Sequence, residues 1–212
     1  TGDTFAVSME GRVLFDLNGD SITQGTTSNG RMIFTVDGSE PVERRQIVDS
    51  AKCNACHQDL RLHGSLRVGV EYCVMCHNPS ATDINRRPVE GGTPETINFK
   101  DMIHKIHTGG ELENPFTIFG FGAAEHDFTE VRFPGDRRAC EICHVENSYG
   151  VPLATGLLPT VISDGVTVIS EKQPERAACT SCHDSLVTES HAILETDPDT
   201  GAETCAVCHG DS

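Results

Sequence analysis

Residues 53–57 read Cys-Asn-Ala-Cys-His, and the same Cys-x-x-Cys-His pattern occurs at four more places in the chain. The repeats are Cys73-Val-Met-Cys76-His77, Cys140-Glu-Ile-Cys143-His144, Cys179-Thr-Ser-Cys182-His183 and Cys205-Ala-Val-Cys208-His209. Together they use all ten cysteines of the 212 residues. Cysteines three residues apart lie on one side of a helical turn, and the histidine follows on that side. Two thioethers to a porphyrin and one imidazole to its iron need this arrangement, so the pattern predicts attachment of c-type haem.

Three other interpretations explain the cysteines less well. A disulfide framework would not place a histidine after every second cysteine. Zinc ribbons pair one Cys-x-x-Cys with another, which five motifs cannot do evenly, and the histidine would have no role. Thioredoxin-like redox motifs occur singly. We therefore expect five c-type haems, held by thioethers from Cys53, Cys56, Cys73, Cys76, Cys140, Cys143, Cys179, Cys182, Cys205 and Cys208.

The ten histidines divide evenly between two expected roles. The motif histidines are the predicted proximal iron ligands: His57, His77, His144, His183 and His209. The other five equal the predicted haems in number, and we expect them to be the distal ligands: His63, His104, His107, His126 and His191. With imidazole on both sides of every iron, no coordination position stays open. The chain is therefore expected to transfer electrons rather than to act as an enzyme with a dedicated catalytic site.

Two of the expected distal ligands are close together in the sequence. Residues 99–107 carry apolar side chains at helical spacing, and Gly109 and Gly110 follow as a stop signal, so the pattern predicts a helix. His104 and His107 then have Cβ atoms about 5–6 Å apart. Two histidines on one iron need Cα atoms roughly 12–13 Å apart, given metal–nitrogen bonds of about 2 Å. We expect these two histidines to serve two different haems.

Residues 49–212 are predicted to form one cytochrome domain of short helices and loops wrapped around the five haems. A compact domain of this length has a radius of gyration of about 15 Å, which leaves haem centres less than roughly 20 Å apart. Neighbouring macrocycles are then within tunnelling range. Trp is absent and aromatic residues make up only 5%, so the porphyrins are expected to supply the core, and the haem-free chain is expected to be unfolded.

Residues 1–48 contain neither cysteine nor histidine and are predicted to form a small antiparallel β segment. Three strands make a poor independent domain, so we expect them either to dock on the haem domain or to be the remnant of a larger β-domain. Strands are expected over 5–10, 12–17 and 31–36. Turns are expected at Asn18-Gly19, Asn29-Gly30 and Asp37-Gly38. Within the haem domain, residues 161–168 predict one hairpin that turns at Asp164-Gly165.

The formal net charge of −16 argues against nucleic acid or anionic lipid as a partner. No apolar run approaches the roughly 18 residues that a membrane span needs. Haem propionates would add negative charge, and the candidate partners for them are Arg44, Arg45, Arg61, Arg67, Arg137, Arg138 and Arg176.

Two acidic stretches have weak similarity to calcium sites. Asp16-x-Asn18-x-Asp20 begins like a calcium loop, but Thr27 stands where the loop needs Glu. The second stretch holds Asp197, Asp199 and Glu203. Turn formation is the favoured interpretation of both, with calcium as the alternative.

Several segments resemble the OmcA/MtrC family of bacterial outer-surface multihaem cytochromes. They are Cys53-N-A-C-H-Q-D-L-R-L-H-G-S-L-R67, Cys73-V-M-C-H-N-P79, Met102-I-H-K-I-H-T-G-G110, Val131-R-F-P-G-D-R-R-A-C140 and Glu203-T-C-A-V-C-H-G210. The resemblance covers about residues 42–210 and extends beyond the haem motifs into the linkers. It implies one pentahaem domain, preceded by the last strands of a Greek-key β-barrel domain, with bis-histidine ligation throughout. It further implies extracellular respiration, in which electrons arrive through a porin–cytochrome conduit or other cytochromes and leave to metal oxides, flavins or soluble shuttles.

We therefore expect an exported electron-transfer module at the exterior of the outer membrane. The chain starts at Thr1 without a signal peptide, so we expect a mature product or a fragment, and haem attachment to this motif in bacteria occurs outside the cytoplasm. One alternative is a soluble periplasmic pentahaem carrier that feeds a reductase. The other is a multihaem enzyme with an open iron, but the Cys-x-x-Cys-Lys motif of pentahaem nitrite reductases does not occur here.

Overall fold

The backbone forms short helices and two-stranded antiparallel sheets joined by long loops. The structure is a computed structural model that describes residues 3–16, 19, 23–26 and 29–210. The chain divides into two compact units, Thr1–Met75 with Glu141–Glu146, and Cys76–Cys140 with Asn147–Ser212. Each is described by itself.

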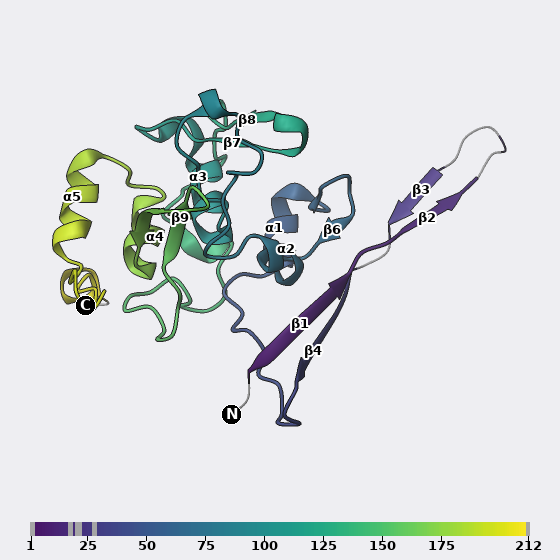
Figure 1. Ribbon diagram of the computed structural model, residues 1–212, viewed down its shortest axis with the longest axis horizontal. Coiled ribbons are helices and arrows are strands. Elements are labelled where there is room, and N and C mark those ends of the chain that lie inside the picture. Colours follow the sequence, from purple (N-terminus) through teal and green to yellow (C-terminus); the bar gives the residue numbers. More distant parts are fainter. Residues whose placement is uncertain (1–2, 17–18, 20–22, 27–28, 211–212) are drawn as a thin grey trace. The chain divides into compact units, whose positions relative to one another are not determined.

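The N-terminal part of the first unit consists of two β ribbons (Figure 1). In the first ribbon, β1 (Thr4–Met9) pairs with β4 (Gly30–Thr35), and Phe5 stacks on the ring of Phe34 with centroids 5.8 Å apart. In the second, β2 (Arg12–Phe15) pairs with β3 (Thr23–Thr26). These strands agree with the expected ranges to within two residues and add β3, which the sequence did not suggest. The expected turn at Asn18-Gly19 lies partly outside the described residues.

The rest of the first unit carries the first haem motif and part of the second and third. Its elements are α1 (Ser50–His57), the short strands β5 (Arg61–Leu62) and β6 (Arg67–Val68), and α2 (Val70–Cys76). Whether residues 1–48 form a separate domain stays a prediction.

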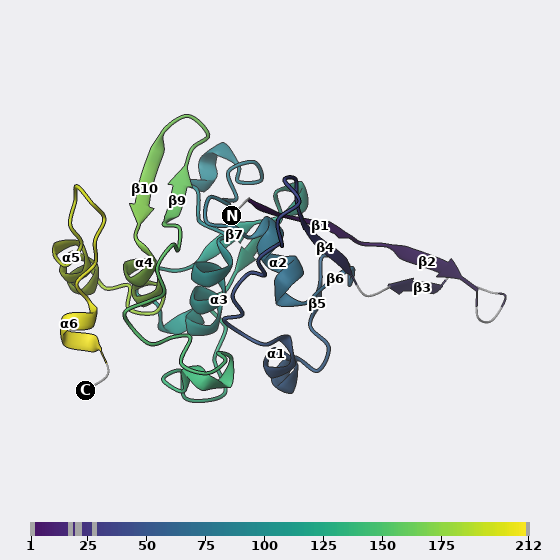
Figure 2. The same ribbon diagram turned by 90° about the horizontal axis from the view of Figure 1, so that it is seen from below.

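The second unit is built around the helix α3 (Phe99–Thr108), which confirms the helix expected over 99–107. It contacts α4 (Pro174–Thr180), and α4 contacts α5 (Leu186–Leu194) (Figure 2). The hairpin expected over 161–168 is also confirmed, with β9 (Thr160–Ser163) paired to β10 (Val168–Lys172) and Asp164 accepting from the amides of Val166 and Thr167. The remaining elements are η1 (Val89–Gly91), η2 (Gly109–Glu111), β7 (Thr117–Phe119), η3 (Phe121–Ala123), β8 (Glu125–Asp127), η4 (Cys140–Ile142) and α6 (Ala206–His209).

The polypeptide by itself has a very small core. Among the described residues, the buried apolar side chains are Val70, Met102, Phe116, Ala177 and Ala192. Large apolar side chains such as Leu186, Leu194 and Val207 are more than three-quarters exposed. These numbers agree with the expectation that cofactors supply much of the core.

No helix in the described ranges is long and apolar enough to cross a membrane.

Candidate haem-binding sites

The first motif occupies the helix α1. The helix begins after Asp49, whose side chain accepts a hydrogen bond from the amide of Ala51 at 2.8 Å. Such a cap fixes where the first turn begins. Cys53, Cys56 and His57 therefore lie on consecutive turns of one short helix, as the attachment pattern requires.

The first and third motifs are tied together within the first unit. The Nζ of Lys52 donates to the carbonyl oxygens of Glu141 and His144, each at 2.6 Å. The amide of Asp49 donates to the carbonyl of Cys143 at 3.3 Å, and Val48 pairs with His144 in an isolated β-bridge. These bonds hold two haem-attachment segments against each other, although about 90 residues separate them in the chain.

Partial burial acts on two functional groups at this contact. It lowers the pKa of His144, and the nearby Lys52 adds to the effect. A neutral imidazole is the form that binds iron, so the shift favours ligation. Burial also raises the pKa of the Cys53 thiol, with Cys143 adding to the effect.

The second motif ends α2 at Cys76, and His77 follows directly. The Nδ1 of His77 donates to the carbonyl of Ile97 at 2.8 Å, and the amide of Phe99 donates to the carbonyl of His77 at 3.0 Å. A carbonyl accepts only from a protonated nitrogen, so the proton is on Nδ1 and the lone pair is on Nε2. This tautomer suits an iron ligand. The bonds also join the second motif to the start of α3.

The helix α3 carries His104 and His107, and both are half-buried. The Nδ1 of His107 donates to the carbonyl of Ile103 at 2.8 Å, which again leaves the lone pair on Nε2. The His107 ring also meets the edge of Phe133, with centroids 5.7 Å apart. The assignment of His104 and His107 to two different haems stays a prediction.

Two glycines after α3 allow another segment to come close. Gly109 has a φ of +54°, and a Cβ there would lie 2.4 Å from the carbonyl oxygen of Val131. A Cβ on Gly110 would lie 2.3 Å from the carbonyl oxygen of Thr129. Two of the segments that carry the family resemblance, 102–110 and 131–140, are therefore in direct backbone contact, which requires the glycines.

The fourth motif begins at the end of α4 and continues as a turn. The amides of Cys182 and His183 both donate to the carbonyl of Cys179, at 3.2 and 3.0 Å. The next residue, Asp184, accepts from the amides of Glu113 at 2.9 Å and Asn114 at 2.7 Å. The motif is thus fixed to the connection that follows η2.

The fifth motif forms the same turn and is tied to the fourth. The amides of Cys208 and His209 donate to the carbonyl of Cys205 at 3.3 and 2.9 Å. Two residues earlier, the carboxylate of Glu203 accepts from the amides of Glu175 at 2.8 Å and Arg176 at 2.6 Å, at the start of α4. This capping bond holds the two attachment segments side by side.

The imidazole rings of His191 and His209 lie at a separation that suits two ligands of one iron. His191 is on α5, and the ring centroids of the two histidines are 6.3 Å apart with their planes at 68°. Two imidazoles on one iron have centroids roughly 6 Å apart, given metal–nitrogen bonds of about 2 Å. The residues therefore fit a bis-histidine haem at the fifth motif.

His126 projects from β8 in the hairpin with β7, opposite Ile118. Its Nε2 lies where a side chain on Gly120 would be, because a Cβ there would be 2.6 Å from that nitrogen. The hairpin is held by Asp83, which accepts from the amide of Phe119 at 3.0 Å, and by Arg87, which donates to the carbonyl of Thr117 at 2.8 Å. Asp83 and Arg87 form an ion pair in which the side chains are 1% and 7% exposed. No sequence pattern pointed to this pair.

His63, the remaining expected distal ligand, follows β5 with a φ of +52° and is exposed. Its charge helps to lower the pKa of Glu10, after the larger effects of hydrogen bonds from Arg67 and Tyr72.

The ten cysteines are all in the described part of the chain and none forms a disulfide. Burial raises the pKa of the Cys179 thiol, and burial together with Glu175 raises that of Cys205 to about 12. Redox-active Cys-x-x-Cys motifs have lowered thiol pKa values, so these directions argue against the thioredoxin-like interpretation.

The other candidate groups have partners in the chain. Asp197 forms a turn by accepting from Asp199 and Thr200, and Glu203 caps α4. Asn18, Asp20 and Thr27 lie outside the described residues, and within those described no cluster of three or more potential metal ligands occurs. Of the arginines expected to pair with haem propionates, the following form ion pairs with Asp or Glu side chains of the chain: Arg61, Arg67, Arg137, Arg138 and Arg176. Arg44 and Arg45 line a small cavity in the first unit.

Repeated Cys-x-x-Cys-His segments on short helices and turns, with a further histidine facing one of them, define a multihaem c-type cytochrome. A profile described as outer membrane cytochrome MtrC/MtrF-like, domains II/IV, matches residues 45–212, and the chain belongs to this family. The family resemblance in the linkers is thereby confirmed.

One curated relative is the multiheme cytochrome MtrC of Shewanella baltica (strain OS185), which is 24% identical over 176 residues. That alignment covers 77% of this chain and 22% of the relative. A crystal structure of MtrC from Shewanella baltica OS185 superposes with a TM-score of 0.48 at 17% identity, over 98% of this chain and 34% of that one. The chain thus spans about a fifth of the curated relative and about a third of the solved one.

Proposed function

We propose that this chain conducts electrons along five c-type haems, each held between two histidines, as a module of extracellular respiration at the cell surface. Family membership supports the class of protein, and the five motifs support the number of cofactors. The observation that carries bis-histidine ligation is the 6.3 Å separation of the His191 and His209 rings. The remaining pairs follow from the equal numbers of motif and non-motif histidines.

Direct bonds between motifs support close spacing of the haems within each unit. Lys52 joins the first and third attachment segments, and Glu203 joins the fourth and fifth. His77 is bonded to the segment that leads into α3, which carries two further predicted ligands. Attachment segments in such contact support haem spacings within the roughly 20 Å estimated from packing.

The bound haems supply reversible one-electron chemistry, and the protein supplies their position and ligation. The cysteines fix each macrocycle, and the two imidazoles keep small molecules away from the iron. Carbonyl partners on the Nδ1 of His77 and His107 fix the ring tautomer for ligation. Imidazole on both sides, without methionine, also gives low reduction potentials.

The test is a haem count by mass spectrometry of the purified holo-protein, combined with the ferric spin state from electron paramagnetic resonance. We expect five haems per chain and only low-spin iron. Fewer haems would contradict the count, and a high-spin ferric signal in the resting protein would indicate an open iron and an enzyme instead.

Location is a separate part of the proposal, with the periplasmic carrier as the alternative. Protease added to intact cells would remove the haem-stained band of a surface protein and spare a periplasmic one. We expect removal, together with reoxidation of the reduced protein by ferric oxide or flavin.

A further inference from the structure

The second unit contains a buried carboxylate that the proposed electron path does not use. Asp101 on α3 is 3% exposed. Its Oδ2 accepts from the Nδ2 of Asn98 at 2.9 Å and from the hydroxyl of Thr160 at 2.8 Å. Its Oδ1 accepts a long bond of 3.5 Å from the hydroxyl of Ser181. These partners come from the start of α3, β9 and the fourth haem motif.

No cation forms an ion pair with this carboxylate among the described residues. The three nearest lysines donate elsewhere: Lys100 to the carbonyl of Pro174, Lys105 to Glu95, and Lys172 to Glu189 and Thr180. A buried carboxylate without a counter-ion holds its proton more tightly than an exposed one. Burial accordingly raises the pKa of Asp101, although Lys100, the Thr160 bond, Lys105 and Lys172 each act in the opposite direction.

Water has room beside the group. A cavity of about 30 Å³ is lined by Asp101, Thr160, Ser181, Lys105 and Lys172, among others. This volume exceeds the roughly 10–15 Å³ that one water needs, and the lining offers the polar partners that keep such water bound. A proton can therefore reach the carboxylate without exposure of the side chain.

The site is close to a redox centre because Ser181 lies inside the fourth motif, between Cys179 and Cys182. Neighbouring Cα atoms are about 3.8 Å apart, so attachment of the fourth haem begins within roughly 10 Å of the carboxylate. The iron lies beyond the attachment point, and two unit charges at about 12 Å, in an effective dielectric of about 20, change a proton affinity roughly tenfold.

We propose that Asp101 is a proton-binding site whose occupancy is coupled to the redox state of the haem at the fourth motif. The inference rests on the proposed function. As a one-electron donor such as a reduced cytochrome delivers an electron, ferric iron becomes ferrous, and the Asp101 carboxylate takes one proton from solvent hydronium, relayed by the cavity water, to become a neutral carboxyl. On oxidation the electron leaves along the haem chain and the proton returns to water. One electron and one proton are thus exchanged together.

The coupling between the proton and the electron is reciprocal, and this determines the expected change in reduction potential. If the electron raises the proton affinity tenfold, the proton raises the reduction potential by the same factor, which is about 59 mV for a one-electron couple. We expect one haem of the wild-type holo-protein to change potential by about 59 mV between acidic and alkaline limits, in redox titrations from about pH 5 to 9.

The Asp101→Asn variant should remove this step. An amide fits the same hydrogen bonds and mimics the protonated carboxyl, so that haem should keep the acid-limit potential at every pH. Thr160→Val keeps the carboxylate but loses a donor to its charged form, so it should move the step to higher pH without abolishing it. Glu130→Gln, an exposed carboxylate, is the matched control, because the haem propionates still titrate in it.

A haem count and low-spin spectrum of every variant separate the two proposals. A missing haem at the fourth motif in the wild type would overturn the proposed function. A full haem complement with the same pH dependence in wild type and Asp101→Asn would overturn the proton site. Should the Asn variant fail to fold, an unmoved step in Thr160→Val would overturn it equally.

Discussion

The imidazole of His191 on α5 faces the imidazole of His209 on α6, with ring centroids 6.3 Å apart and both residues exposed. Bonds between the end of α5 and the fifth motif hold the arrangement: the amide of Thr204 donates to the carbonyl of Glu195 at 3.0 Å, and Thr196 pairs with Glu203. The backbone thus holds the two imidazoles at a separation that suits the proposed ligation of one iron.

Replacement of His191 tests this pair. In His191→Met one haem should change from two imidazoles to His/Met ligation, which raises the reduction potential. A spectroelectrochemical titration should therefore show about one haem in five reduced at a higher potential than in the wild type. Ser190→Ala, on the neighbouring residue of the same helix, should leave the titration unchanged. An unaltered titration in His191→Met would remove His191 from the ligand set.

Gly120 should be needed for the position of His126. The backbone at Gly120 is allowed for alanine, with a φ of −102°, but the new Cβ would lie 2.6 Å from the His126 Nε2. In Gly120→Ala the ring should move rather than the chain unfold, since a side chain gives way more easily than backbone. We expect one haem to lose its distal ligand and to give a high-spin ferric signal, with a melting temperature close to that of the wild type.

Gly30→Ala is the control for this substitution, because no atom lies within 4 Å of the position of its Cβ. If Gly120→Ala kept every iron low-spin, His126 would not be a ligand.

Local sequence patterns predict the candidate haem-binding groups more readily than the contacts that hold them in place. The five motifs, the helix at 99–108 and the hairpin turning at Asp164 follow from spacing and turn chemistry, which are local properties. The same motif nevertheless adopts different backbones, as a helix in α1, a helix end and turn after α4, and a short terminal helix in α6. Bonds to distant segments select among these forms, and spacing alone does not encode them.

The supporting residues were not predictable for the same reason. Asp83 and Arg87 look like an ordinary i,i+4 surface pair in the sequence, yet both side chains are buried because the β7–β8 hairpin closes over them. Asp101 stands beside apolar Met102 in an amphipathic pattern and could have been assigned to the exposed face. Its burial depends on Thr160 and Ser181, which are 59 and 80 residues away.

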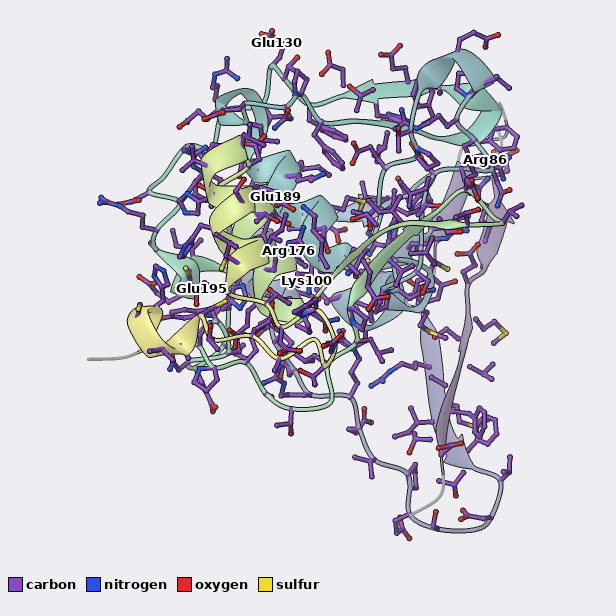
Figure 3. The ribbon with its side chains drawn as sticks, turned by 60° about the vertical axis from the view of Figure 1, so that its left-hand side comes forward. Arg86, Lys100, Glu130, Arg176, Glu189 and Glu195 are labelled. Atoms are coloured by element: carbon purple, nitrogen blue, oxygen red, sulfur yellow. The ribbon has the colours of Figure 1, made fainter. Side chains whose placement is uncertain are left out.

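The Glu189 carboxylate should make the stability of the region around the fourth and fifth motifs depend on pH. Figure 3 labels this carboxylate next to Arg176, with which it forms an ion pair, and Lys172 donates to it at 3.1 Å. Burial raises its pKa, but the hydrogen bond from Arg176 and the charge of Lys172 outweigh burial, so the net pKa is lowered. A lowered folded pKa gives stability that is present above the unfolded value of about 4.3 and is lost as pH falls through the folded value.

Glu189→Gln should therefore lower the free energy of unfolding by about 1 kcal/mol at pH 7, a figure reduced for partial exposure, and by less at pH 3. Urea unfolding of the holo-protein followed by far-ultraviolet circular dichroism measures this difference. The exposed Glu130→Gln should match the wild type at both pH values, and a deficit in Glu189→Gln that persisted undiminished at pH 3 would contradict the ion-pair explanation.

Removal of the haems should unfold the chain. The described residues bury few apolar side chains, namely Val70, Met102, Phe116, Ala177 and Ala192. Without covalent cofactors to cover apolar side chains such as Leu194 and Val207, hydrophobic burial does not offset the conformational entropy of ordering the loops. A chain with all ten cysteines replaced by alanine should give the circular dichroism spectrum of a disordered polypeptide and no cooperative thermal transition. The control is the Cys205→Ala/Cys208→Ala variant, which loses only the fifth haem and should stay folded with a lower melting temperature. A cooperative transition in the haem-free chain would instead show that the polypeptide has a sufficient core of its own.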